Sequence, residues 1–226
     1  MGELIDMESA RALVADRALW PRMRDFLWDF ASQVHPSWLE GLEGLPPSAV
    51  SLLPSSPRVK RAVLDALGVA PCYHPFPKDD FSRFVLLDGE TLESLARWLG
   101  ALACADKLRG VTSGKVVRAL KTALPGVYPE VFGYTAYFKG AKIDDLGFKM
   151  EEGGGGEIGR LGGHILLFLL KSLPESLVLR LKLKLPKSYS DELSPDVKIQ
   201  SSSLSQKSLT RLLKLKFPEA YSLCCS

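Results

Sequence analysis

The chain has 226 residues, of which 46% are hydrophobic and 24% charged, and its formal net charge is +3. This length suffices for one domain with a substantial core or for two small ones. The weak charge does not by itself indicate a nucleic-acid binder. The longest apolar run, ILLFLL at 165–170, is far shorter than the roughly 20 residues that a membrane-spanning helix needs.

The N-terminal sequence and the cysteines favour a cytoplasmic protein. MGELIDMESARALVADR carries acidic residues where a signal peptide has a basic segment and an apolar core, so we expect no export signal. The chain has four cysteines, Cys72, Cys104, Cys224 and Cys225. None of them forms a CxxC pair, and the last two are adjacent. This spacing is a poor disulfide framework and favours a reducing compartment.

The first third of the chain predicts two amphipathic helices. Residues 19–34 place their apolar side chains on one stripe at helical spacing, and Pro36 ends this helix, since the residue before a proline avoids the helical conformation. A proline-rich irregular segment follows at 36–57. Residues 57–67 then predict a second helix, and 69–80, with three prolines, a loop.

The central region predicts three helices in succession. Residues 90–109 give the strongest pattern, and Gly110 ends it. Residues 114–124 repeat the pattern, with Thr112 or Ser113 as the helix cap. After the turn at Pro125-Gly126, we expect a further helix over 127–138.

The remaining sequence alternates loops and helices. Residues 139–160 are rich in glycine and acidic side chains and predict a flexible surface loop. Helix should resume near Ile158, and Ser172-Leu173-Pro174-Glu175 matches a capping box that opens the next helix. The stretch LVLRLKLKL at 177–185 alternates like a strand, but Leu and Lys are helix formers, and we favour helix. A serine-rich loop at 187–206 precedes a last helix at about 204–216, which Pro218 ends.

These patterns predict a mainly α fold: a compact multi-helix domain with long irregular loops and little or no β structure. We expect an N-terminal and central helical region at 1–138, the glycine-rich loop at 139–160, and a C-terminal helical region at 161–226 that packs on the same domain.

One segment partly matches a phosphate-binding loop. That motif is GxxxxGK followed by Ser or Thr, because backbone amides and the lysine hold the phosphates while the hydroxyl binds magnesium. Here Gly110 and Gly114 are one residue too close, and Val116 follows Lys115 where the hydroxyl should be. We therefore favour a helix start with a solvated lysine.

A second segment, Gly154-x-Gly156-x-x-Gly159, formally matches a dinucleotide-binding fingerprint. The fingerprint works only when a buried strand delivers the glycines to a helix N-terminus. The preceding GFKMEEG is not a buried strand, so we favour the loop. A nucleotide-binding enzyme that uses either glycine segment remains an alternative.

Other residue combinations do not indicate a catalytic or metal-binding site. His35, His74 and His164 are scattered, and Cys72 with His74 lacks a second pair of metal ligands. We therefore expect no catalytic, cofactor-binding or metal-binding residues, and no enzymatic activity.

The basic C-terminal third and one tryptophan are candidate contact features. Cations at 180–187 and 207–216 could face anionic lipid or RNA, but no aromatic residues interleave with them for base stacking. We favour a solvated helix face or an acidic protein partner. Trp38 lies beside residues that end a helix. It either packs in the core or contacts a partner protein, and we favour the core.

Three ordered segments carry a family resemblance. LARWLGALACADKLRGVTSGKVVRALKTALPGVYPEVFGY is similar to the central signature of the type III secretion accessory proteins called SctK, with their relatives YscK, OrgA and MxiK. LLFLLKSLPESLVLRLKLKLP and LTRLLKLKFPEAYSL resemble the later helices of that family, and HPSW resembles its N-terminal part. The likeness covers about half of the chain, and the tetraglycine run departs from the family pattern.

The resemblance implies a non-enzymatic, largely helical adaptor of the injectisome. Such a protein would link the pod protein SctQ to the cytoplasmic domain of the inner-membrane ring protein SctD, and through them SctL and the SctN ATPase, at the cytoplasmic face of the bacterial inner membrane. It implies no nucleic-acid partner and no membrane insertion. Our candidate interface residues are Trp38, Arg97, Arg109, Arg118 and Tyr128.

Overall fold

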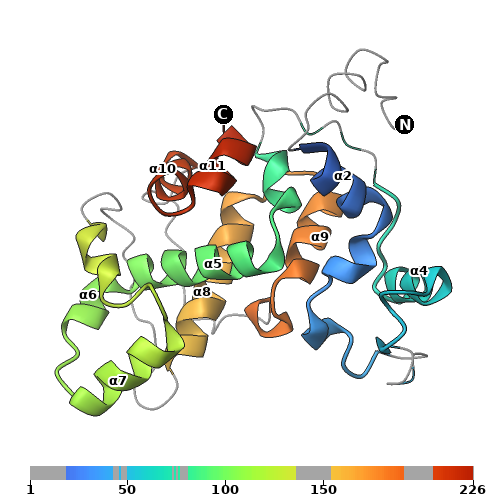
Figure 1. Ribbon diagram of the computed structural model, residues 1–226. Helices are drawn as coiled ribbons and strands as arrows, with labels where there is room; N and C mark the ends of the chain where they lie inside the picture. Colours follow the sequence, from blue (N-terminus) through green and yellow to red (C-terminus); the bar gives the residue numbers. More distant parts are fainter. Residues whose placement is uncertain are drawn as a thin grey trace. The chain divides into compact units, whose positions relative to one another are not determined.

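The computed structural model describes residues 19–42, 46, 50–72, 74, 76, 81–135, 154–190 and 206–225. Within these ranges every regular element is a helix, so the predicted mainly α fold is confirmed (Figure 1). Most of the two long predicted loops, at 139–160 and 187–206, lies outside the described residues.

The chain forms two compact units, and each unit is assembled from separate stretches of sequence. Unit 1 comprises Met1–Gly89, Lys171–Lys187 and Phe217–Ser226, and unit 2 comprises Glu90–Leu170 and Ser188–Lys216. This grouping differs from a division at 139–160, because segments that are distant in sequence pack together.

Unit 1 is built around a cluster of phenylalanines. Its elements are α2 (Leu19–Trp28), η1 (Phe30–Gln33), η2 (Pro36–Trp38), α4 (Pro57–Ala66), η3 (Ser82–Leu86), α9 (Glu175–Lys184) and α11 (Pro218–Cys225). Phe26 of α2 is fully buried, and its ring meets Phe30 and Phe76 edge-on at centroid distances of 5.6 and 5.5 Å. These edge-to-face contacts add to the burial of large apolar side chains that stabilises the unit.

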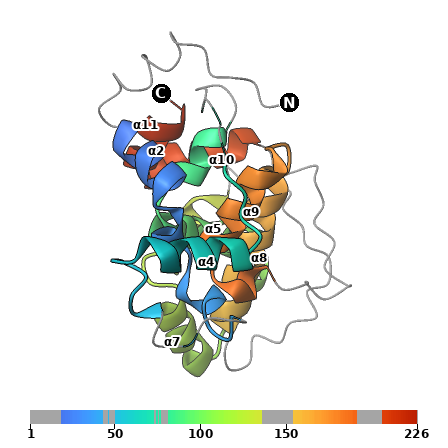
Figure 2. The ribbon, with the colours of Figure 1, turned by 90° about the vertical axis from the view of Figure 1, so that its right-hand side faces the viewer.

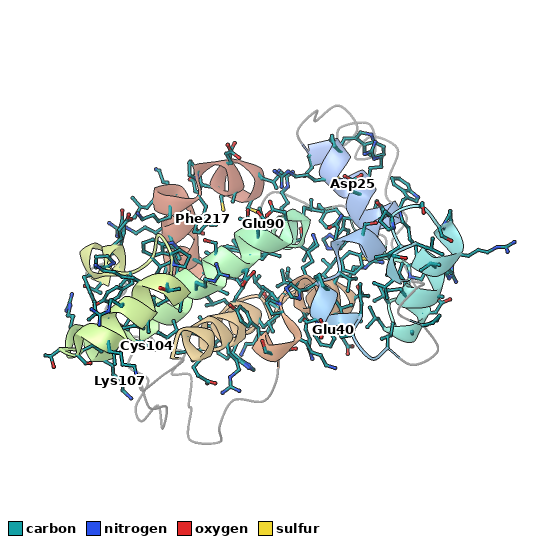
Figure 3. All side chains as sticks on the ribbon, turned by 60° about the horizontal axis from the view of Figure 1, so that its bottom comes forward. Asp25, Glu40, Glu90, Cys104, Lys107 and Phe217 are labelled. Carbon is teal, nitrogen blue, oxygen red and sulfur yellow. The ribbon has the colours of Figure 1, made fainter. Side chains whose placement is uncertain are left out.

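Unit 2 contains most of α5 (Gly89–Ala103) with α6 (Ala105–Arg109), α7 (Gly114–Ala123), η4 (Glu130–Gly133), α8 (Gly154–Leu169) and α10 (Gln206–Lys216). The short η6 (Lys187–Tyr189) leads into it. The described part of its core is mainly aliphatic, with Leu92, Leu95, Leu99, Ile165 and Leu212 fully buried. The predicted helices at 90–109 and 114–124 are confirmed, with one break at Cys104, where α5 gives way to α6 (Figure 3).

Two predicted helices are shorter than their apolar patterns. The helix expected at 19–34 ends at Trp28, and Asp29 leaves the helical conformation before the single 3-10 turn of η1. The helix expected at 127–138 was wrong over its described part, 127–135, because η4 is the element that forms there. Pro129 cannot donate an amide hydrogen bond, and Gly126 has a positive φ of 70° that turns the chain just before it.

Helix α8 begins at Gly154, four residues before the predicted start, and glycines allow it to pack closely on α5. A Cβ on Gly162 would lie 1.6 Å from the carbonyl oxygen of Ala96, and one on Gly100 would lie 1.9 Å from that of Ile158. The backbones of α5 and α8 therefore touch where they cross (Figures 1 and 2). On α8, Gly159 and Gly163 also leave room for the ring of Tyr189.

The C-terminal elements confirm one prediction and correct two. LVLRLKLKL is helical in α9, as favoured, because Leu177, Leu181 and Leu183 are buried against the rest of unit 1. The predicted capping box was wrong: Pro174 occupies the N-cap position, and no side chain caps the helix. Pro218 begins α11 instead of only ending the preceding helix, since proline is well tolerated in the first turn.

Candidate interaction surface

Buried cations in unit 1 hold the chain together through backbone carbonyls. Arg83 donates through Nε to the carbonyl of Phe76 at 3.0 Å and through a terminal nitrogen to that of Leu223 at 3.2 Å. Lys184 donates to the carbonyls of Val85 and Leu87 at 2.6 and 2.9 Å. Burial lowers the pKa of Lys184 to about 7, opposed by the negative charge of Asp88.

Arg180 of α9 is the third of these cations and is 3% exposed. Its terminal nitrogens donate to the carbonyls of Phe26 and Ala70, both at 2.9 Å. Its guanidinium carbon lies 4.9 Å from the ring centroid of Phe26 and 4.7 Å from that of Phe30. Its Nε is buried and has no hydrogen-bond partner. The basic C-terminal stretch is thus not one solvated face, because Arg180 and Lys184 lie inside unit 1.

A groove of about 490 Å³ opens between α2 and α4 in unit 1; we call it the α2–α4 groove. Its apolar lining is Leu27, Trp28, Pro57, Leu64, Val69 and Pro71. Trp28 is 68% exposed, although its ring also meets Trp20 edge-on at 5.9 Å. A large, well-exposed aromatic beside a groove is typical of interaction surfaces.

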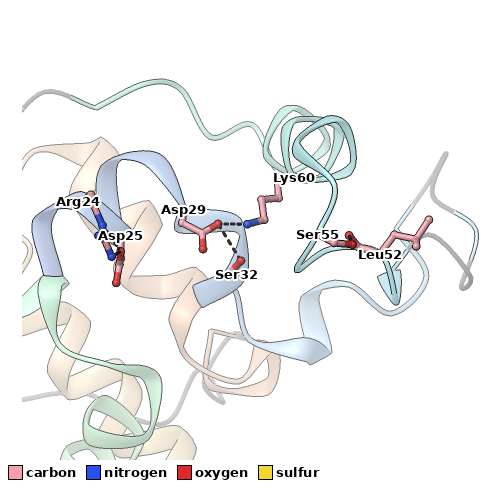
Figure 4. A network of polar contacts seen from close by, with 7 residues as sticks. All are labelled: Arg24, Asp25, Asp29, Ser32, Leu52, Ser55 and Lys60. Carbon is pink, nitrogen blue, oxygen red and sulfur yellow. Dashed lines mark hydrogen bonds and ion pairs between the residues drawn. The ribbon is translucent and has the colours of Figure 1, made fainter. Parts of the chain in front are cut away.

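Paired charges surround this groove. Asp29 accepts hydrogen bonds from Lys60 of α4 at 2.5 Å and from Ser32 of η1 at 3.0 Å (Figure 4). Arg24 pairs with Asp25 at 2.8 Å, as the same view shows. Arg61 pairs in turn with Asp65 at 3.1 Å. The sequence pattern did not reveal the groove, because its two helices are separated by an irregular segment.

Among the predicted interface residues, Trp38 belongs to unit 1 and is half-buried. Its indole N–H donates to the carbonyl of Leu185, just after α9, at 2.9 Å. The same short segment is tied to α9 by the His35 amide, which donates to Leu183 O at 2.8 Å, and by Ser37 Oγ, which accepts from the Lys187 amide at 2.8 Å. Trp38 therefore stabilises the end of α9 through this hydrogen bond.

Trp38→Phe should lower the free energy of unfolding by about 1 kcal/mol, because it keeps an aromatic ring but leaves the Leu185 carbonyl without its donor. Urea denaturation followed by circular dichroism measures the change. Trp28→Phe is the matched control, since Trp28 is largely exposed and the same replacement there should change stability by less than about 0.5 kcal/mol. Equal effects from the two variants would contradict this stabilising role of Trp38.

Two predicted residues, Arg109 and Tyr128, meet at one aromatic ring in unit 2. The guanidinium of Arg109 lies 5.7 Å from the ring centroid of Phe132, and Tyr128 meets the same ring edge-on at 5.6 Å. Arg109 also donates to the hydroxyl of Thr135 at 2.6 Å, and its side chain is 50% exposed. We call Arg109, Tyr128 and Phe132 the Arg109 cluster.

The structure does not bring Arg97 and Arg118 into this cluster by any observed contact. Arg97 is half-buried and forms an ion pair with Glu93 on α5, and both residues hydrogen-bond with Tyr189. Burial raises the pKa of Tyr189, as does the charge of Glu93. Arg118 lies exposed on α7. Arg97 is therefore engaged inside unit 2, whereas Arg118 is accessible.

A lysine that sequence reasoning missed as a site residue is held by aromatic rings. Lys216 Nζ lies 4.8 Å from the ring centroid of Trp98 and 4.6 Å from that of Tyr134, and it forms an ion pair with Glu130. Burial opposes the charge of Lys216, but hydrogen bonds with Glu130 and Tyr134 outweigh it and raise its pKa. This contact attaches the end of α10 to the turn around η4.

The first partial nucleotide motif lies in the turn between α6 and α7, and the second lies at the start of α8. Helix α6 leads into Gly110, and Lys115 is exposed in the first turn of α7. Ser113 takes the N-cap position there but makes no side-chain cap bond. The glycines at 154–159 form the start of α8. A helix, not a strand, precedes the first segment, and the glycines of the second lie within a helix, whereas both motifs need a tight glycine turn after a strand.

The part of the chain that the structure describes contains no group of three His, Cys, Asp or Glu side chains that could hold a metal ion. It also contains no helix that is long and apolar enough to cross a bilayer. Burial raises the pKa of the Cys104 thiol to about 12, and burial raises that of Cys224 as well, so neither is a ready nucleophile near neutral pH.

Comparison with known proteins assigns no family: no family model, curated protein or solved structure matches the chain.

Proposed function

We propose that this protein is a non-enzymatic adaptor of the SctK type in a bacterial type III secretion system. It would connect a SctQ-like pod protein to the cytoplasmic domain of a SctD-like ring protein, and through them SctL and the SctN ATPase. It would then work in the cytoplasm at the inner face of the inner membrane. The proposal rests on the three ordered segments that resemble the family.

The Arg109 cluster is the observation that best supports a protein-binding role. Arginine and tyrosine are the residue types most enriched at energetic centres of interfaces. Here both are accessible and are held against a phenylalanine by ring contacts, so little conformational entropy remains to be lost on binding. The cluster also lies within the segment that resembles the family signature.

Co-expression with SctQ-like and SctD-like proteins from the same genome, followed by size-exclusion chromatography, tests the proposal. The full chain should co-elute with the SctQ-like protein and bind the SctD-like domain more weakly. Failure to bind either partner, while circular dichroism shows a helical protein, would overturn it.

Arg109→Glu should weaken binding to the SctQ-like protein by roughly thirtyfold or more, because it reverses the charge of an accessible cluster residue. Tyr128→Ala should act in the same direction. Lys121→Glu is the control: it makes the same charge reversal at another exposed position in unit 2. Isothermal titration calorimetry of the three variants distinguishes a local contact from a general charge effect, which would weaken binding equally in Lys121→Glu.

A further inference from the structure

The proposed adaptor role does not use the α2–α4 groove. We propose that the groove receives a short acidic segment of a partner protein, with one carboxylate pairing with Arg180 and an adjacent apolar side chain packing on Trp28 and Leu64. The inference is independent of the secretion role, because the groove belongs to unit 1 and the Arg109 cluster to unit 2.

The charges of the groove are unbalanced by one cation. Four cations and three carboxylates line it. Arg24, Lys60 and Arg61 each have an aspartate partner within the lining, at 2.8, 2.5 and 3.1 Å. Arg180 is the fourth cation, and among the described residues its hydrogen bonds go to carbonyl oxygens alone. A single carboxylate from a partner would give the fourth cation an acidic partner as well.

Arg180 is also the side chain whose hydrogen bonding is incomplete. It is 3% exposed, and its Nε has no partner. A buried N–H without an acceptor is destabilising, and a buried charge is tolerated best when an opposite charge faces it. Burial lowers the pKa of this guanidinium, which agrees with a charge that lacks compensation. The rings of Phe26 and Phe30 fix its plane, so an incoming carboxylate would meet an already ordered donor.

The apolar lining indicates what accompanies the carboxylate. Trp28 exposes most of its ring, and Leu64 is half-buried on the facing helix. A volume of about 490 Å³ lies within the range of small binding sites and suits a few side chains of a peptide. A membrane surface or RNA would need several unpaired cations, whereas the other three here are already paired.

Fluorescence anisotropy with the full chain tests this site. The probe is a labelled short peptide that carries a glutamate and a leucine side by side on one face, and its matched control has glutamine in place of glutamate. The glutamate peptide should bind roughly tenfold to a hundredfold more tightly than the glutamine peptide, as expected for a charge-assisted hydrogen bond. Equal affinity for the two peptides, or binding of neither, would overturn the proposal.

Variants locate the binding on the protein. Leu64→Asp should abolish it, because the new carboxylate would stand in the groove and repel the peptide. Leu52→Asp is the control, since Leu52 is 52% exposed and lies outside the groove lining. Arg180→Met should remove the preference for glutamate, and circular dichroism checks that this variant is folded. If Arg180→Met does not fold, Leu64→Asp tests the assignment instead. Peptide binding unchanged in Leu64→Asp would overturn the assignment.

Other occupants are outcomes of the same experiment. Citrate that displaces the peptide at equal concentration would show that a free carboxylate suffices and would overturn the peptide assignment. Binding to vesicles of anionic lipid that Leu64→Asp abolishes would assign the groove to a membrane surface instead.

Discussion

Gly162→Ala is expected to destabilise unit 2 by about 3 kcal/mol or more, because the added methyl group has no space. Its Cβ would lie 1.6 Å from the carbonyl oxygen of Ala96 and 2.8 Å from the amide nitrogen of Gly100. Both are backbone atoms of α5, so no side-chain rotation relieves the overlap. The two helices must separate, and the apolar contacts around the crossing are lost with them.

A control on the same helix isolates this effect. Alanine is a better helix former than glycine by about 1 kcal/mol, and a Cβ on Gly156 would meet nothing within 4 Å. Gly156→Ala should therefore leave stability unchanged or raise it slightly. Urea denaturation of both variants, followed by circular dichroism, measures the difference, and equal stability of the two would contradict the close approach of α5 and α8.

Lys184 should make the protein more stable as the pH rises above 7. Its folded-state pKa is about 7, because burial disfavours the charge, whereas the unfolded-state value is near 10.5. Between these values the unfolded state binds more protons than the folded state, so the free energy of unfolding increases with pH. The slope for one proton is at most about 1.4 kcal/mol per pH unit.

Lys184→Met removes this titrating group and should remove that slope. The comparison is made between about pH 7 and about pH 8.5, where cysteines of the unfolded chain begin to lose their protons equally in both proteins. Other groups that face Lys184, namely Asp88, Arg22 and Arg180, are present in both proteins, so their contributions cancel in the difference. Lys182→Met, on the same helix and half-exposed, should retain the wild-type slope. Parallel pH profiles of wild type and Lys184→Met would contradict the assignment.

Sequence patterns predicted the helices that carry strong apolar periodicity, and they failed where one residue overrides the pattern. Residues 57–67 and 114–124 match α4 and α7 closely. The apolar stripe of 19–34 continues past Trp28 although the helix does not, because Asp29 turns away and pairs with Lys60 of another helix. Such a distant partner is not visible in a local pattern.

The candidate sites were less predictable than the helices, since they depend on tertiary contacts. The alternation in LVLRLKLKL suggested cations on an exposed face, yet Arg180 and Lys184 meet backbone carbonyls of distant segments. The glycines of 154–159 suggested a loop, but they form the start of α8, and Gly159 leaves room for the ring of Tyr189. Arg109 and Tyr128, chosen separately, do share a cluster, because the turn at Gly126 brings η4 back to α6.

The composition of unit 1 from three distant segments has a consequence for the order of synthesis. Arg83, next to the fully buried Phe84, donates to the carbonyl of Leu223, and α11 packs on η3. A ribosome that has released residues 19–89 has therefore made only part of the unit. The segment 171–187 follows after residues 90–170 of unit 2, and the segment from 217 onward follows after residues 188–216 of unit 2. During that interval the phenylalanines around Phe26 lack their cover from α9, and nascent chains with exposed apolar surface are substrates for chaperones. The unit closes only after translation has passed α11.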